Sequence, residues 1–283
     1  MSKIALVTDS TASMPKDLVE KYNIIVAPQI LIWGNETFED GVNITPGEFY
    51  ARLKKTSVMP STSQVTVSKF FEIYQQLLKE EYQILNILIS SKLSGTINSA
   101  EQAKSMLPAG APVEIVDSSS TAMAMGFHLL TVARAIKQGA SLAESVQLAQ
   151  KASQHTGLFF AVDTLEFLHR GGRIGGATRF LGTALNIKPI LELRDGRVEP
   201  AEQVRTRKKS LNRIIELAEK HIAGQVPVRL AALHAAAAED AQFILQEASA
   251  RLNPIETYFS EVSPVVGANA GPGVVGIVFM AGM

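Results

Sequence analysis

The segment ILNILISSKLSGT, residues 84–96, decides the fold of this chain. Its first half is a short, mainly apolar run, which predicts a strand covered on both faces, and its second half is a polar loop that leads into a helical pattern. Three further apolar runs, Ile4 to Val7, Ile24 to Ala27 and Val113 to Val116, alternate with helical patterns in the same way. Repetition of strand, helix and strand predicts right-handed crossovers and a mostly parallel sheet with helices on its faces.

The pattern changes beyond about residue 155. An Asp195-Gly196 turn joins the run Pro189 to Leu193 to the residues from Val198 onward, which predicts a β-hairpin and antiparallel pairing. The other elements predicted in this half are helices near Thr206 to His221 and Glu239 to Leu252, and strands near Leu158 to Val162, Val228 to Leu233, Glu256 to Phe259 and Val274 to Met280. The sequence therefore predicts an α/β protein with a Rossmann-like parallel-sheet domain at residues 1–154 and an α+β domain with a mixed, largely antiparallel sheet at residues 155–283.

The composition excludes several classes of protein. The 283 residues contain no cysteine, which excludes disulfides, thiol nucleophiles, iron–sulfur clusters and cysteine-ligated zinc, and fits a reducing cytoplasm. The 27 Lys and Arg balance 27 Asp and Glu, which argues against a general nucleic-acid binder. The N-terminus leads directly into a strand and lacks the apolar stretch of a signal peptide, so we expect no export by that route.

The uncharged segment at residues 262–283 is the one stretch that resembles a membrane span. It contains Pro264, Asn269, Pro272 and five glycines, which suit a spanning helix poorly, so we interpret it as a turn followed by a buried strand. Residues 271–276, GPGVVG, literally match a dinucleotide fingerprint, but the seven residues that follow leave no room for the required helix and acidic residue. We therefore reject a dinucleotide site and keep Asn269 as either a turn former or a ligand contact.

Three polar loops lie where predicted strands end and helices begin, at residues 8–13, 60–64 and 90–96. Ligands collect beyond the carboxyl ends of parallel strands, and the free amides of a helix N-terminus favour an anion. Thr62 and Ser94 add hydroxyl donors there, and Gly95 allows close approach of the backbone to a ligand. Helix capping is the alternative role for each hydroxyl, but three such loops together favour a binding site.

A second candidate region is residues 163–175, DTLEFLHRGGRIG. Arg170 ends an apolar, helix-compatible turn and precedes paired glycines, so a guanidinium suited to a carboxylate or a phosphate is presented on a tight bend. Residues 169–213 hold 11 Lys or Arg against 4 Asp or Glu, so this neutral chain is locally basic. Solvated surface charge accounts for most of the basic residues from Arg205 to Arg213, but less well for Arg170 and Arg173.

An enzyme is one alternative that these residues leave open. Ser94 as a nucleophile would need a histidine base, and His169 is the one histidine in a loop near other candidates. Asp9 and Asp117 could instead serve as acid–base or metal groups in a hydrolase or a phosphotransferase-like enzyme. The sequence contains no phosphate-loop, His-Glu-x-x-His or Gly-x-Ser-x-Gly motif. A binding module for another small anion is the third hypothesis.

Six motifs occur in the order VTDST (7–11), PSTSQ (60–64), SSKLSGT (90–96), VDS (116–118), LEFLHRGGRI (165–174) and GPG (271–273). With this set, which covers nearly the whole chain, the sequence resembles the DegV family, the fatty-acid-binding subunits of bacterial fatty acid kinase. The resemblance implies a cytoplasmic, non-catalytic carrier that binds a long-chain fatty acid such as palmitate or oleate. It implies no metal, no other cofactor and no nucleic acid, and it is compatible with transient contact with a membrane surface.

The resemblance also implies a partner and site residues. A separate kinase subunit, related to dihydroxyacetone kinases, phosphorylates the bound carboxylate, and the acyl phosphate then enters phospholipid synthesis. Thr62 and Ser94 match family positions whose hydroxyls bind the carboxylate, with Gly95 beside them, and Arg170 matches the arginine that supports this network. The family usually has a histidine two residues before its Gly-Pro-Gly bend, whereas this chain has Asn269, which cannot titrate.

The acyl chain needs only an apolar wall. At about 0.8 kcal/mol per buried methylene, about 15 methylenes contribute about 12 kcal/mol, so affinity should come from the tail and orientation from the head group. The candidates for this wall, each of which is otherwise ordinary core, are Leu158, Phe159, Phe160, Phe167, Phe180, Leu181 and Phe279.

Overall fold

The computed structural model describes residues 3–182 and 187–283. Its first sheet has the strand order β2-β1-β6-β7, and every neighbouring pair is parallel. The four strands are β1 (Lys3–Asp9), β2 (Ile25–Ala27), β6 (Tyr82–Leu88) and β7 (Val113–Asp117). These are the apolar runs predicted as strands, so the parallel sheet is confirmed.

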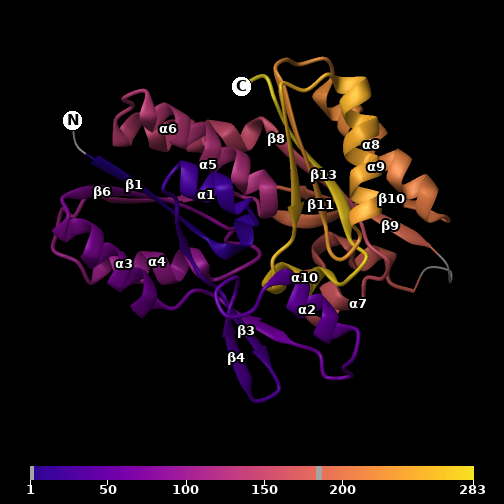
Figure 1. Ribbon diagram of the computed structural model, residues 1–283, viewed down its shortest axis with the longest axis horizontal. Helices are drawn as coiled ribbons and strands as arrows, with labels where there is room; N and C mark the ends of the chain where they lie inside the picture. Colours follow the sequence, from indigo (N-terminus) through magenta and orange to yellow (C-terminus); the bar gives the residue numbers. More distant parts are fainter. Residues whose placement is uncertain (1–2, 183–186) are drawn as a thin grey trace.

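Helices cover both faces of this sheet (Figure 1). Ile84 and Leu88 of β6 pack toward α3 and α4, whereas Leu85 and Ile87 pack toward α5 and α6. Because successive side chains of a strand point to opposite faces, both sets of positions are buried, which explains why the run is apolar at every position except Asn86. The helices of this half are α1 (Lys16–Lys21), α2 (Pro46–Leu53), α3 (Val67–Lys79), α4 (Thr96–Ser105), α5 (Ala122–Lys137) and α6 (Leu142–Gln154), with the short 3₁₀ helix η1 (Ser10–Ala12).

A small antiparallel sheet corrects one expectation from the sequence. Its order is β4-β3-β5, built from β3 (Ile30–Trp33), β4 (Glu36–Glu39) and β5 (Ser61–Ser63). Residues 60–64 were expected to form a loop between a strand of the parallel sheet and a helix, but Thr62 lies in a strand opposite Leu31. Pairing with β3 organises this Ser- and Thr-rich segment, which has no apolar pattern of its own.

The second sheet has the order β10-β9-β8-β13-β11-β12, and within it only β11 and β12 run parallel. Its strands are β8 (Thr156–Ala161), β9 (Lys188–Arg194), β10 (Arg197–Val204), β11 (Val228–His234), β12 (Glu256–Glu261) and β13 (Val275–Ala281). The predicted mixed sheet, the hairpin with its Asp195-Gly196 turn and the buried C-terminal strand are confirmed. No helix within residues 3–182 and 187–283 combines the length and apolar character needed to cross a membrane.

One face of the second sheet is covered by α8 (Arg207–Ile222) and α9 (Ala238–Leu252) (Figure 1). The other face turns toward α5 of the first half, so that Met123 and Phe127 share one apolar cluster with Val278 and Met280 of β13. The elements α7 (Glu166–Arg170), η2 (Gly175–Phe180) and α10 (Pro264–Ala270) belong to this side of the molecule. A large apolar cluster therefore lies between the two sheets.

Candidate functional site

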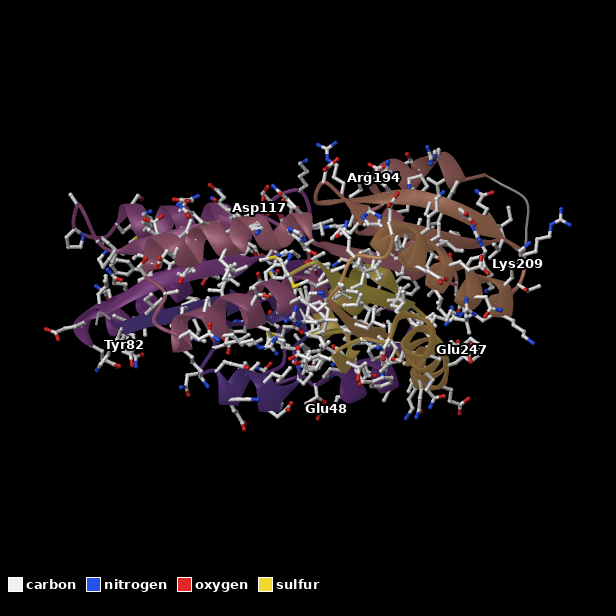
Figure 2. The ribbon with its side chains drawn as sticks, turned by 90° about the horizontal axis from the view of Figure 1, so that it is seen from above. Glu48, Tyr82, Asp117, Arg194, Lys209 and Glu247 are labelled. Carbon is white, nitrogen blue, oxygen red and sulfur yellow. The ribbon has the colours of Figure 1, made fainter. Side chains whose placement is uncertain are left out.

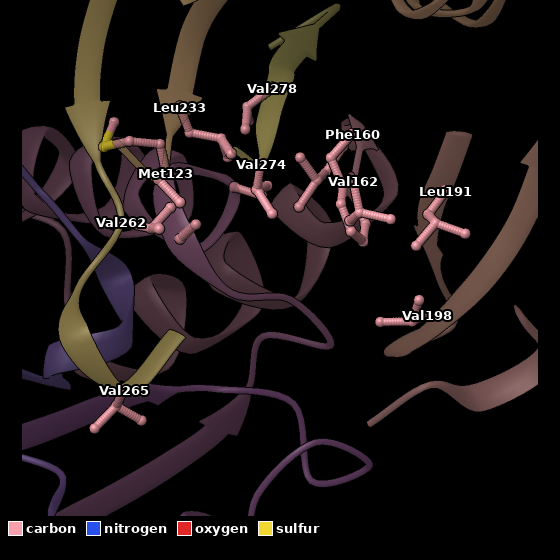
Figure 3. Close-up of a cluster of buried hydrophobic side chains, with 14 of the residues drawn as sticks. Met123, Phe160, Val162, Leu191, Val198, Leu233, Val262, Val265, Val274 and Val278 are labelled. Atoms are coloured by element: carbon pink, nitrogen blue, oxygen red, sulfur yellow. The ribbon is translucent and has the colours of Figure 1, made fainter. Parts of the chain in front are cut away.

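A cavity opens inside the apolar cluster between the two sheets. Figure 3 shows Phe160 of β8, Leu233 of β11, Val198 of β10 and Val265 of α10 in this region. The described residues that line it come from both halves of the chain: Thr11, Gln29, Thr62, Ser63, Gln64, Ile89, Leu93, Ser94, Thr121, Ala122, Leu158, Phe160, Leu168, Arg173, Leu193, Val198, Leu233, Val262, Val265, Val266, Asn269, Ala270 and Val274. The wall is mainly aliphatic and aromatic, with polar side chains supplied mostly by loops.

Three of the predicted site residues meet at this cavity. The Asn269 amide donates to Thr62 Oγ1 at 3.2 Å and to the Val265 carbonyl at 2.9 Å, which joins α10 to β5. Ser94 Oγ lies 2.8 Å from Thr96 Oγ1 and accepts from the Thr96 amide at 3.3 Å. The site thus combines hydroxyls from the first half of the chain with an amide from the second.

Gly95 is the neighbour of Ser94 in the sequence, but it is not among the described residues that line the cavity. A Cβ atom at Gly95 would lie 2.6 Å from Oε1 of Gln64, so glycine lets the Gln64 amide pack against the start of α4. Gln64 itself lines the cavity and donates to Ser99 Oγ at 3.3 Å. The absence of a side chain at Gly95 therefore allows the Gln64 side chain to pack closely next to Ser94.

Arg170 and Arg173 occupy different places around the cavity. Arg170 lies in an adjoining pocket, where its exposed guanidinium is 3.1 Å from Glu166. Arg173 lines both the cavity and that pocket, and its Nε donates to the Leu93 carbonyl at 3.0 Å. Thr62 and Asn269 also border both spaces. Arg170 is therefore near the predicted head-group residues, but Arg173 is the arginine that reaches the cavity wall.

Only two of the residues predicted for the apolar wall line this cavity. Leu158 and Phe160 line the cavity, but Phe159 and Phe279 belong to the cluster under α8 and α9, on the opposite face of the sheet. Alternation along a strand makes this separation necessary, because Phe159 lies between two inward-facing neighbours. Phe167 lines the adjoining pocket, Phe180 is only partly buried, and Leu181 is 42% exposed. These last three residues are absent from the described cavity wall.

Several polar residues of the cavity wall were not predicted from the sequence. Gln29 is 2% exposed and Thr11 1% exposed, yet both line the cavity, together with Gln64 and Thr121. Gln29 belongs to no motif. It is held beside the cavity by the hydrogen bond from its side-chain amide to Asp9, the last residue of β1. The segment PSTSQ contains Gln64, and VTDST contains Thr11, so these two could have been found as neighbours of the polar loops.

The Asp9 side chain links the end of β1 to the residues around it by hydrogen bonds. It is fully buried and accepts hydrogen bonds from the Thr11 amide (3.0 Å), Gln29 Nε2 (3.1 Å) and the Ile89 amide (2.8 Å), as well as from the Thr11 hydroxyl. Burial raises the pKa of Asp9, and these hydrogen bonds oppose the rise. Its carboxylate is occupied by protein donors, which gives Asp9 a structural role.

The other residues of the enzyme alternative do not gather around Ser94. Asp117 is exposed and accepts from Ser91 and Ser119, and His169 is an exposed residue of α7. Neither residue is among the described lining of the cavity that contains Ser94. Among residues 3–182 and 187–283, no group of three or more metal-binding side chains lies together. The described structure therefore offers the Ser94 hydroxyl no histidine base.

A second buried carboxylate, Asp40, ties α10 to the first half. Asp40 is 2% exposed and accepts from Ser10 Oγ at 2.6 Å and from the Val265 amide at 3.3 Å. Ser10 Oγ in turn accepts from the Gln29 amide at 3.1 Å. Burial raises the pKa of Asp40 to about 6, against the lowering effect of the Ser10 hydrogen bond. Asp40 thus holds the helix that carries Asn269.

Replacement of Asp40 by Asn should change the pH dependence of stability. Because the pKa of about 6 in the folded protein lies above the ordinary aspartate value of 3.8, the folded state binds more protons between these values, and wild-type stability falls as pH rises. The free energy of unfolding of Asp40→Asn relative to wild type should therefore increase by up to about 3 kcal/mol from pH 4 to 7. Urea denaturation at several pH values measures the difference in the free energy of unfolding between Asp40→Asn and wild type. Replacement of the exposed Asp17 by Asn is the control. A difference between Asp40→Asn and wild type that does not change with pH would refute the prediction.

Comparison with known proteins identifies the family. A family model described as "Uncharacterised protein, DegV family" matches residues 3–282. The chain belongs to the DegV family. Protein DegV of Bacillus subtilis (strain 168) is 36% identical over 275 residues, which cover 97% of this chain and 98% of that protein. A DegV domain-containing protein of Streptomyces coelicolor is also 36% identical, over 277 residues that cover 97% of each chain.

Solved DegV structures share the whole fold. A DegV family protein from Thermus thermophilus, described by its fatty acid binding, superposes with a TM-score of 0.93 at 33% identity over 99% of each chain. DegV from Bacillus subtilis, described as a fatty acid binding protein, gives a TM-score of 0.90 at 34% identity over 99% of this chain and all of the other. The two-sheet architecture is therefore that of DegV proteins.

Asn269 occupies a defined position in this DegV protein. A Cβ atom at Gly171 would lie 2.3 Å from Asn269 Oδ1, so glycine in the bend after α7 makes room for the amide. The amide nitrogen is directed to Thr62 and to the Val265 carbonyl. Asn269 therefore holds Thr62 with a group that carries no charge at any ordinary pH.

Proposed function

We propose that this protein binds a long-chain fatty acid in the cavity between its two sheets, without catalysing a reaction on it. One observation carries the proposal: a mainly apolar cavity has Thr62, Ser94, Asn269 and a guanidinium in its wall. Hydroxyl, amide and guanidinium donors suit a carboxylate, and an apolar wall suits an alkyl chain. The fatty acid binding described for two DegV relatives supports the same ligand class.

The acyl chain should supply most of the affinity. Burial of about 15 methylenes contributes about 12 kcal/mol, whereas a carboxylate must first lose its hydration. The polar group then fixes the direction in which the ligand lies. We expect Arg170, which lines the adjoining pocket, to support the head group from outside the cavity.

Lipid analysis of the purified protein tests this proposal. Native mass spectrometry should find a long-chain fatty acid at about one per chain, and the delipidated protein should take up palmitate or oleate. An unrelated protein prepared from the same cells gives the background of non-specific lipid. A delipidated, folded protein that binds neither acid would refute the proposal. Esterase or phosphatase turnover that disappears in Ser94→Ala would favour the enzyme alternative.

We also propose that the bound acid is presented to a separate kinase subunit. Arg205, just before α8, and Lys208 and Lys209, in its first turn, are exposed, and no acidic side chain of the described chain forms an ion pair with them. Their neighbours Arg207 and Arg213 are instead paired with Asp240 and Glu202. Figure 2 shows Lys209 at the outer surface of the molecule. Unpaired surface cations favour docking of an acidic partner surface.

Substitution of this basic surface should uncouple binding from phosphorylation. Arg205→Ala or Lys208→Ala should slow acyl phosphate formation with added fatty acid kinase catalytic subunit by roughly 10-fold, since each interface charge pair adds about 1 kcal/mol or more, and should leave oleate binding unchanged. Lys220→Ala, at the other end of α8, is the matched control. Unchanged acyl phosphate formation in both variants would remove α8 as the docking surface.

A further inference from the structure

Arg173 differs in charge from every other residue of the described cavity wall. It is the one ionisable side chain among the described residues that line the cavity. It is also partly buried, and no acidic side chain of the described chain pairs with it, whereas Arg170 is paired with Glu166. A partly buried cation without a counter-ion is costly, and its attraction for an anion is stronger than at the open surface.

The bend after α7 explains why the two arginines point to different places. Arg170 is the last residue of α7, so it stays on the helix four residues after Glu166. Gly172 has a φ of +72°, and the Arg173 amide donates back to the Leu168 carbonyl at 2.9 Å. This left-handed step reverses the chain, as glycine commonly does after a helix. Arg173 is therefore turned back toward the cavity.

Two carbonyl groups hold the Arg173 guanidinium in place. Its Nε donates to the Leu93 carbonyl at 3.0 Å, and one Nη donates to the Gly171 carbonyl. The other Nη has no hydrogen-bond partner within the described residues. Leu93 directly precedes Ser94, and Arg173 and Ser94 both line the cavity, so the guanidinium is held on the backbone that carries Ser94 and retains a free donor. Fixed donors with an unused N–H are suited to a charge-assisted hydrogen bond with a carboxylate.

We propose that Arg173 is the counter-ion of the ligand carboxylate and so determines the preference of the site for acids. The inference rests on the proposed function and adds to it where the head group lies. Thr62, Arg173 and Asn269 border both the cavity and the adjoining pocket. A carboxylate held at this border has its tail in the cavity and its oxygens toward the pocket that contains Arg170.

Paired ligands of equal length test the inference. Dissociation constants of oleic acid and oleyl alcohol are measured on delipidated wild type, Arg173→Gln, Arg173→Lys and Arg170→Gln, with Arg194→Gln as a surface control, since Arg194 pairs with Glu192 outside the cavity. Arg173→Gln should weaken oleic acid binding by roughly 10- to 100-fold, the usual range for a hydrogen bond to a charged group. It should change oleyl alcohol binding by less than about threefold, which also shows that the variant is folded. Arg173→Lys should recover part of the preference for the acid.

Other outcomes overturn the inference in distinguishable ways. Unchanged preference for the acid in Arg173→Gln, or loss of that preference in Arg170→Gln alone, would contradict Arg173 as the counter-ion while the proposed function stands. Equal loss of both ligands in Arg173→Gln would assign Arg173 only a structural role at Leu93 and Gly171. Failure of the delipidated wild type to bind oleic acid would overturn the proposed function itself.

Discussion

Replacement of Ala270 by Trp should abolish fatty acid binding at micromolar ligand. Ala270 is the last residue of α10 and lines the cavity, so an indole at this position would occupy the space of the acyl chain. Exclusion of about four methylenes removes about 3 kcal/mol at about 0.8 kcal/mol each. The dissociation constant for oleate should therefore rise by more than about 100-fold. Isothermal titration calorimetry with delipidated protein measures this change.

The matched control for Ala270→Trp is Ala250→Trp. Ala250 is exposed on α9, on the far side of the second sheet, so its replacement adds the same indole away from the cavity. Filling an existing cavity should also cost Ala270→Trp at most about 1–3 kcal/mol of stability. If Ala270→Trp binds oleate as tightly as wild type, the ligand does not lie in this cavity.

Replacement of Asp9 by Ala should be the most destabilising single change at the site. It removes the acceptor of four hydrogen bonds and leaves the buried Thr11, Gln29 and Ile89 donors unsatisfied. Each unsatisfied buried donor costs about 1–3 kcal/mol, so we expect the free energy of unfolding to fall by about 3–5 kcal/mol. Urea denaturation at neutral pH measures the loss.

Asp117→Ala is the matched control, because it tests whether the loss of stability in Asp9→Ala comes from the burial of Asp9 and its hydrogen bonds. Asp117, like Asp9, is the last residue of a parallel strand and accepts hydrogen bonds, but it is exposed, so its replacement should cost less than about 1 kcal/mol. A small loss in both variants would contradict the structural assignment of Asp9. Catalytic turnover that requires either carboxylate would revive the enzyme alternative.

Local sequence patterns were sufficient for most of the architecture. The apolar runs of β1, β6 and β7 predict a covered parallel sheet because each face of that sheet is packed by helices. The Asp195-Gly196 pair predicts the β9–β10 hairpin because both residues have positive φ, +49° and +77°. In these places the local preference and the tertiary structure agree.

Tertiary contacts decide what the sequence could not predict. β5 is a strand because β3 lies beside it, and its three residues, Ser61 to Ser63, have no strand-forming pattern. Gln29 lines the cavity because Asp9 binds its amide, a contact across 20 positions that no motif reports. Arg170 and Arg173 can be told apart only by the direction of the bend at Gly172. The polar loops were thus recognised, but the geometry of the guanidinium was not.

A crystal structure of the protein loaded with a brominated long-chain fatty acid would show whether the acyl chain lies in the cavity between the two sheets. We expect anomalous bromine density between the two sheets, close to Leu158, Phe160 and Leu233, with the carboxylate within hydrogen-bond distance of Ser94 and Arg173. Bromine density only on the outer surface, or under α8 and α9 beside Phe159 and Phe279, would contradict it.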